Sequence, residues 1–98
     1  MLDLSSKSSE FAWEWLTKYV IEQPKNDKSL TWFVSAARLY KDYANDSLRS
    51  AKTPLTFNDF WAALQLRAER VKAGKMRGVT PVYTGVRYFR DGVIIFGL

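Results

Sequence analysis

The chain has 98 residues, of which 47% are hydrophobic, 15% aromatic and 26% charged, enough for one hydrophobic core but too few for a second lobe around an enclosed substrate cleft. It has no cysteine and no histidine, which excludes disulfides, the usual zinc ligands and the commonest general base near neutral pH. The net charge is +5. The excess of positive charge lies in residues 49–90, which contain nine Lys and Arg but only two acidic residues, Asp59 and Glu69. This one-sided excess favours a polyanionic partner such as nucleic acid.

The sequence carries no targeting or membrane signal. Its apolar runs are shorter than the roughly 18 residues needed to cross a bilayer, and residues 1–7 lack the apolar core of a signal peptide. We therefore expect an intracellular protein, cytoplasmic or in the nucleoid or nucleus, with no membrane contact. No repeat or linker interrupts the chain, so residues 1–98 are predicted to form one domain behind a flexible lead of residues 1–8.

The first predicted helix covers about residues 9–22. Its apolar stripe consists of aromatic side chains four residues apart, Phe11, Trp15 and Tyr19. Ser8 or Ser9 suits the N-cap position, and Pro24 ends the helix because the residue before proline is disfavoured in helical geometry.

A short strand and a second helix follow. Residues 30–34 are aromatic and β-branched and predict a strand, and Ser35 is placed to cap a helix over about 36–46. The apolar stripe of that helix is Ala36, Leu39, Tyr40 and Tyr43. The polar run 45–47 is predicted to end it.

The third predicted helix begins at Phe57 and ends near Val71. Thr56 and Asp59 form a near capping box in which aspartate replaces the usual glutamate, so Asp59 is interpreted as a capping residue. The helical spacing of the apolar residues predicts the buried face: Phe57, Phe60, Trp61, Leu64, Ala68 and Val71.

The C-terminal part is rich in strand-forming residues. Strands are predicted at 76–79 and 82–89, on either side of Thr80-Pro81. Asp91-Gly92 is a strong signal for a two-residue hairpin leading to a further strand at 93–96. The expected fold class is therefore α+β, with three helices, a C-terminal β-hairpin and an extra strand.

This order of elements resembles the winged-helix fold, a helix-turn-helix followed by a β-hairpin wing. The residues that carry the resemblance match RFX-type DNA-binding domains: Trp15-Leu16, Leu39-Tyr40-x-x-Tyr43, Phe57 with Phe60, and Tyr83-x-Gly85-Val86-Arg87. A similar pattern occurs in the C-terminal winged helices of phage and plasmid primase-helicases. The resemblance covers about residues 11–89. Similarity to RFX-type domains implies a role in transcription regulation. Similarity to the primase-helicase domains implies a role in DNA replication, in a viral or mobile-element protein.

The resemblance implies that the third helix and the wing contact DNA. In most winged helices the third helix enters the major groove, whereas the RFX-type branch is known for placing the wing there. On the third helix, the candidates lie off the apolar stripe and carry groups that bind base edges or phosphates: Asn58, Gln65, Arg67 and Arg70.

The basic segment after the third helix supplies the remaining candidates for DNA contact: Lys72, Lys75, Arg77 and Arg87. Gly74 and Gly78 interrupt the segment and would let the backbone turn tightly or approach a phosphate. Arg87 alternates with Val86 and Tyr88 and should point away from the core.

We therefore predict a module that binds double-stranded DNA, without catalytic residues, metal or cofactor. Glu10 and Glu14 are four residues apart on the first helix, but they lie in an exposed first turn, which does not favour catalysis. Trp13, Trp32 and Trp61 are interpreted as packing residues rather than base-stacking platforms, with Trp13 as a possible partner contact.

The alternative is a winged-helix protein-interaction module, for instance an adaptor or a virus-encoded inhibitor of a host nucleic-acid machine. Its basic face would then meet a charged protein. A protein partner or a homodimer stays open at this point.

Overall fold

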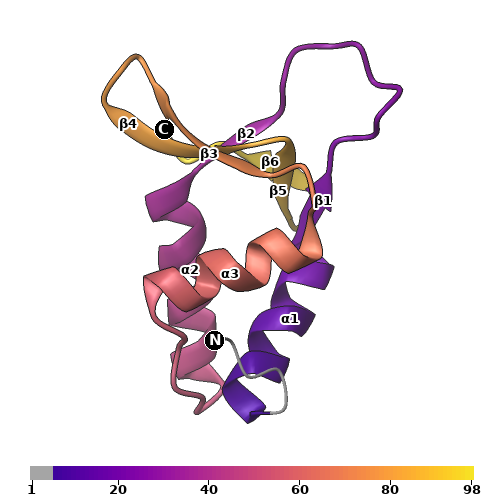
Figure 1. Cartoon of the computed structure of the whole chain (residues 1–98). Coiled ribbons are helices and arrows are strands. Elements are labelled where there is room, and N and C mark those ends of the chain that lie inside the picture. Colours follow the sequence, from indigo (N-terminus) through magenta and orange to yellow (C-terminus); the bar gives the residue numbers. More distant parts are fainter. Residues whose placement is uncertain (1–5) are drawn as a thin grey trace.

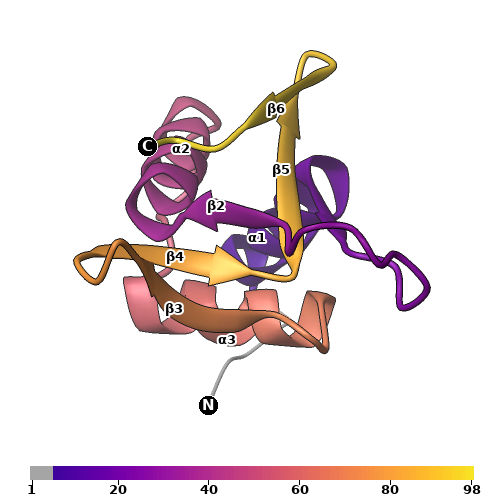
Figure 2. The ribbon, with the colours of Figure 1, turned by 90° about the horizontal axis from the view of Figure 1, so that it is seen from above.

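Three helices and two small antiparallel sheets make up residues 6–98, the part of the chain that the computed structural model describes. In chain order the elements are α1 (Lys7–Tyr19), β1 (Val20–Glu22), β2 (Phe33–Ser35), α2 (Ala36–Arg49), α3 (Phe57–Arg67), β3 (Lys72–Met76), β4 (Thr80–Thr84), β5 (Val86–Arg90) and β6 (Val93–Ile95). The strands lie above the helices in Figure 1, and the view from above in Figure 2 shows the strands in front of them. The predicted α+β class is confirmed.

Helix α1 begins earlier and ends earlier than predicted. The side chain of Ser6 accepts a hydrogen bond from the amide of Ser9 at 3.1 Å, so Ser6 is the N-cap and the assignment of Ser8 or Ser9 is wrong. The helix stops at Tyr19 because the next three residues are extended and pair with β5. The predicted flexible lead therefore does not reach residue 8, and residues 1–5 lie outside the described part.

The caps of α2 and α3 are confirmed. The hydroxyl of Ser35 accepts from the amide of Arg38 at 3.2 Å, and that of Thr56 accepts from the amide of Asp59 at 3.2 Å. Helix α2 runs three residues past its predicted end, because the buried hydroxyl of Ser47 donates to the carbonyl of Lys52 at 3.1 Å instead of ending the helix.

The end of α3 differs from the prediction. The helix stops at Arg67 rather than near Val71, since the backbone of Ala68 is extended, with φ −137°. The shorter helix releases residues from 72 onward for strand β3. The whole basic segment is therefore strand and turn, with no part of it on α3.

The first sheet has the order β2-β4-β3, and the second has the order β1-β5-β6. The predicted strand at 76–79 is wrong, because residues 77–79 form the turn of the hairpin β3–β4, with positive φ at Arg77 and Gly78. The hairpin at Asp91-Gly92 is confirmed: both residues have positive φ, and Arg90 pairs with Val93.

The predicted strand 82–89 is divided at Gly85 into strands of different sheets. Figure 2 shows the chain turning there from β4 into β5. Gly85 has φ +84°, and a Cβ at this position would lie 2.9 Å from the carbonyl oxygen of Arg70. A side chain would be strained and would collide with backbone, so glycine is required at the joint between the two sheets.

The hydrophobic core lies between the strands and the three helices. The rings of Tyr43 and Phe60 stack with centroids 4.6 Å apart, and Trp15 meets Tyr43 edge-on at 5.7 Å. The largest fully buried side chains come from all three helices and from β1, β2 and β5: Tyr43, Tyr88, Phe60, Leu16, Leu39, Leu64, Val20, Val34 and Val86. Phe57 is the exception to the predicted stripes, with 46% of its surface exposed.

Candidate nucleic-acid interface

The hairpin β3–β4 carries three of the predicted contact residues. Lys72 and Lys75 lie on β3, the outer strand of its sheet, and Arg77 lies in the turn. All three side chains are exposed, and none forms an ion pair with another residue of the described range 6–98. The structure thus places these three cations on one projecting element, with Lys72 and Lys75 on opposite faces of β3 because they are three residues apart along the strand.

Helix α3 holds the hairpin through an aromatic stack. The rings of Trp61 and Tyr83 are nearly parallel, 6° apart in orientation, with centroids 5.0 Å apart. Burial raises the pKa of Tyr83 to about 12, and its hydroxyl makes no hydrogen bond within residues 6–98. Trp61 is therefore a packing residue, as predicted, and fixes β4 on α3.

The candidates on α3 separate into free and engaged side chains. Asn58 and Gln65 are exposed. Arg67 is half-buried and donates from Nη2 to the carbonyl of Val20 at 3.2 Å, which ties α3 to the junction of α1 and β1.

Arg70 lies just after α3 and is also engaged. Its guanidinium donates to the carbonyl of Gln23, and its Nε lies 3.8 Å from a carboxylate oxygen of Glu22. The backbone amide of Arg70 donates to the same carboxylate at 2.7 Å. Arg70 therefore fastens the α3–β3 connection to the segment after β1.

The exposed surface of α3 is not basic. Besides Asn58 and Gln65 it presents Phe57 and Leu66, which are 46% and 57% exposed, and the carboxylate of Asp59. The unpaired positive charge in this part of the molecule therefore lies on the hairpin and not on the helix.

Arg87 lies apart from the hairpin cations, beyond the turn at Gly85. As predicted, it points to the side of β5 opposite the buried Val86 and Tyr88. Its guanidinium stacks on the ring of Trp32, with the central carbon 4.2 Å from the ring centroid, and its Nε is buried without a hydrogen-bond acceptor in residues 6–98. The predicted contact residues therefore lie in two separate places: Arg87 is on β5, and the others are on α3, in the α3–β3 connection and on the hairpin.

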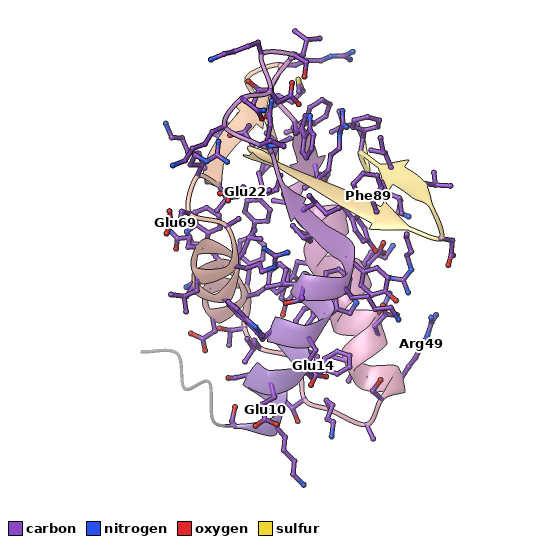
Figure 3. All side chains as sticks on the ribbon, turned by 90° about the vertical axis from the view of Figure 1, so that its right-hand side faces the viewer. Glu10, Glu14, Glu22, Arg49, Glu69 and Phe89 are labelled. Atoms are coloured by element: carbon purple, nitrogen blue, oxygen red, sulfur yellow. The ribbon has the colours of Figure 1, made fainter. Side chains whose placement is uncertain are left out.

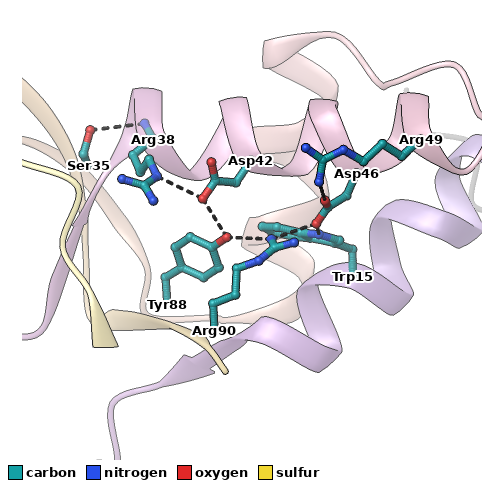
Figure 4. Close-up of polar contacts among 8 residues, drawn as sticks. All are labelled: Trp15, Ser35, Arg38, Asp42, Asp46, Arg49, Tyr88 and Arg90. Carbon is teal, nitrogen blue, oxygen red and sulfur yellow. Dashed lines mark hydrogen bonds and ion pairs between the residues drawn. The ribbon is translucent and has the colours of Figure 1, made fainter. Parts of the chain in front are cut away.

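A polar network that no sequence pattern indicated joins β5 to α1 and α2 (Figure 4). Asp46 accepts from the indole of Trp15 at 2.8 Å and from Arg90 at 2.7 Å. Tyr88 donates to Asp42 at 2.8 Å and accepts from Arg90 at 3.0 Å. No spacing in the sequence signals this network, because its carboxylates are on α2 and their partners are far along the chain.

The charges of this network stabilise one another. Burial opposes ionisation of Asp46, but the hydrogen bonds from Arg90 and Trp15, together with the positive charges of Arg90 and Arg49, hold the pKa of Asp46 below its usual value. Burial also raises the pKa of Tyr88 to about 12. The network borders a hollow of about 350 Å³ whose lining includes residues of α1 and α2, and two cations of the lining, Arg49 and Arg90, are paired with Asp46.

The acidic residues are spread over the molecule. Figure 3 shows Glu10 and Glu14 on α1 at the end away from the strands, and Glu22 and Glu69 on the side of α3. Within residues 6–98 no three potential metal ligands lie together, and no helix there is long and apolar enough to cross a membrane. No family model matches the chain, and no curated protein or solved structure is significantly similar to it.

Proposed function

We propose that the chain is a winged-helix module that binds duplex DNA, with the hairpin β3–β4 as the wing and main contact and α3 beside it. The strand order supports the fold assignment, because β2, which lies between α1 and α2, pairs with β4 of the hairpin. The elements α1, β2, α2, α3, β3 and β4 follow the succession expected of a winged helix.

The observation that carries the proposal is the set of unpaired cations on the hairpin. Lys72, Lys75 and Arg77 are exposed on an element that α3 fixes through the Trp61–Tyr83 stack. Cations held in this way neutralise phosphates and release counterions, which supplies most of the affinity of a DNA-binding protein.

The two elements have different roles in this proposal. The hairpin contacts phosphates, while Asn58 and Gln65 on α3 are free to meet base edges. Arg67 and Arg70 stabilise the position of α3 and of the α3–β3 connection, because both already bind carbonyl oxygens. A regulatory role in transcription or replication belongs to the same proposal.

The test is a charge reversal on the hairpin with a matched control. Lys75→Glu with Arg77→Glu should weaken binding to a random duplex of about 20 base pairs at least tenfold and lower the salt slope by about 2 units. Lys7→Glu with Lys41→Glu makes the same change in net charge at exposed positions on α1 and α2 and should have a small effect. Equal affinity of the two variants, measured by fluorescence anisotropy, would reject the hairpin as the DNA contact.

A second candidate function is protein interaction through the side of α3 that carries Leu66, an apolar side chain that is 57% exposed. Protein interaction replaces DNA binding as the proposed function if the protein shows no salt-dependent affinity for duplex DNA but does self-associate. Leu66→Lys would then return it to the monomer in sedimentation velocity. Monomeric behaviour of the unchanged protein at high concentration would argue against a homodimer on this face.

A further inference from the structure

We infer that the loop of residues 23–32, together with Arg87, forms a second contact with the same DNA duplex. The inference rests on the proposed function and extends it to a segment in which the sequence predicted no DNA-contact residue. Figures 1 and 2 both show this loop and the hairpin projecting at opposite ends of the strand layer. A duplex lying across the strands would meet both.

The loop is held in place at both ends. The side-chain oxygen of Gln23 accepts from the amide of Trp32 at 2.9 Å. The amide of Gln23 donates to the carbonyl of Gly85, and the amide of Gly85 donates to the carbonyl of Trp32, both at 2.8 Å. Because these bonds fix the two ends of the loop before it binds, less conformational entropy is lost on contact with DNA than for a loop with free ends.

A hollow connects the loop to the base of the hairpin. It has a volume of about 420 Å³, and its lining includes Lys25 from the loop, Arg70 from the α3–β3 connection and Lys72 from β3. The hollow places Lys25 beside one of the hairpin cations. The positive surface therefore continues from the hairpin towards the loop.

The carboxylates near this surface are mostly engaged. Glu22 is bound by Arg70, and Asp27 accepts from the amide of Ser29 at 2.8 Å. Asp27 and Glu69 both line the hollow, and each offsets one positive charge. Lys25 and Lys28 are exposed, and within residues 6–98 neither has an ion-pair partner.

Arg87 supplies a cation of a different kind at the end of the loop. Its guanidinium lies over the ring of Trp32, with the central carbon 4.2 Å from the ring centroid, and its buried Nε has no acceptor among the described residues. The negative charge of Asp27 interacts with the positive charge of Arg87 and offsets part of it. A guanidinium already held by stacking can bind a phosphate with little further ordering.

The size of the molecule matches this arrangement. Its longest dimension is 38 Å, and duplex DNA rises about 3.4 Å per base pair, so the whole protein covers about 11 base pairs. A duplex of about 20 base pairs is longer than the whole molecule and can reach from the loop to the tip of the hairpin, whereas a stem of about six base pairs, roughly 20 Å long, is shorter than the longest dimension of the molecule.

The experiment compares three double variants on these two DNAs: Lys25→Glu with Lys28→Glu, Lys75→Glu with Arg77→Glu, and the control Lys7→Glu with Lys41→Glu. On the long duplex, the loop variant should lose about tenfold in affinity and about 2 units of salt slope relative to the control. On the short stem it should bind like the control, whereas the hairpin variant should be weakened on both DNAs. Thermal melting checks that all variants are folded.

The outcomes separate the two proposals. If the loop variant binds the long duplex like the control while the hairpin variant is weakened, the loop contact is refuted and the proposed function stands. If no variant differs from the control, the proposed function itself is refuted. Arg87→Lys keeps the charge but removes the planar stack, and it should lose about threefold on the long duplex only. An equal loss on both DNAs would refute the role of Arg87 in the loop contact.

Discussion

Two regions of the strand layer use positive charge in opposite ways. In the polar network, Arg90 binds Asp46 at 2.7 Å and Tyr88 at 3.0 Å, next to the buried core. On the hairpin β3–β4, Lys75 and Arg77 point into solvent without ion pairs among residues 6–98. The excess charge of the second half of the sequence is therefore divided: one part stabilises the fold, and the other is free for a partner.

The packing of the two strands explains this difference. In β5, Val86 and Tyr88 are completely buried, so substitutions there act on the core. In β3, four of five residues are exposed and Met76 is half-buried. A buried charge must be paired to be tolerated, whereas an exposed one need not be. Stability and binding should therefore respond to different substitutions.

The largest expected effect is at the joint between the two regions. Gly85→Ala should lower the free energy of unfolding by about 3 kcal/mol, because alanine is strained at positive φ and its Cβ would meet the carbonyl of Arg70 at 2.9 Å. Urea denaturation measures the loss. Gly92→Ala is the matched control, since Gly92 also has positive φ but a Cβ there would meet no atom within 4 Å, and it should cost only about 1 kcal/mol. Equal losses would show that the contact with Arg70 is unimportant.

The next largest effect is expected in the polar network, where it tests the pairing of Asp46 with Arg90. Asp46→Asn should cost about 2 kcal/mol at pH 7, because it removes the charge-assisted bond to Arg90. Arg49→Ala should cost less than about 0.5 kcal/mol, since Arg49 lies 3.7 Å from the same carboxylate and is 78% exposed. A similar loss in both variants would contradict the central place of Arg90.

The effect of Asp46→Asn on stability should depend on pH, in a direction that follows from the pKa of Asp46. The pKa of Asp46 is lowered in the folded protein, so its contribution to stability is complete above the unfolded pKa of about 3.9 and is lost as the pH falls through the folded value. The difference in stability between the unchanged protein and Asp46→Asn should therefore shrink between about pH 5 and pH 2. A constant difference in urea titrations over this range would reject the assignment.

The smallest expected effect is on the hairpin. Replacing Lys72, Lys75 and Arg77 together by alanine should change the free energy of unfolding by less than about 0.5 kcal/mol, because these side chains make no ion pair among residues 6–98. Thermal melting at moderate salt measures it. A loss near that of Asp46→Asn would remove the distinction between the two regions.

The local parts of the fold could be predicted from the sequence. Ser35 and Thr56 cap their helices, and Asp91-Gly92 forms the expected hairpin. These features depend on side chains and backbone within a few residues of each other. The alternation that directed Arg87 away from the core also depends only on neighbouring residues.

The remaining features depend on contacts between distant segments. Val20–Glu22 has the pattern of a helix end but pairs with β5, which lies far along the chain, as Val20 with Tyr88 shows. Asp46 has the pattern of a polar residue at a helix end, and its partners Trp15 and Arg90 are on other elements. Arg67 was predicted to contact DNA because it lies off the apolar stripe of its helix. Its bond to the carbonyl of Val20 joins segments that are far apart in the chain, so no local pattern signals it.

The position of β3 has a consequence for solubility. It is an outer strand, so the backbone groups on its free side could pair with a strand of another molecule. Such pairing would force Lys72 and Lys75 out of water and against like charges of the neighbouring copy. The cations that are available to a partner thus also keep this exposed strand from aggregating.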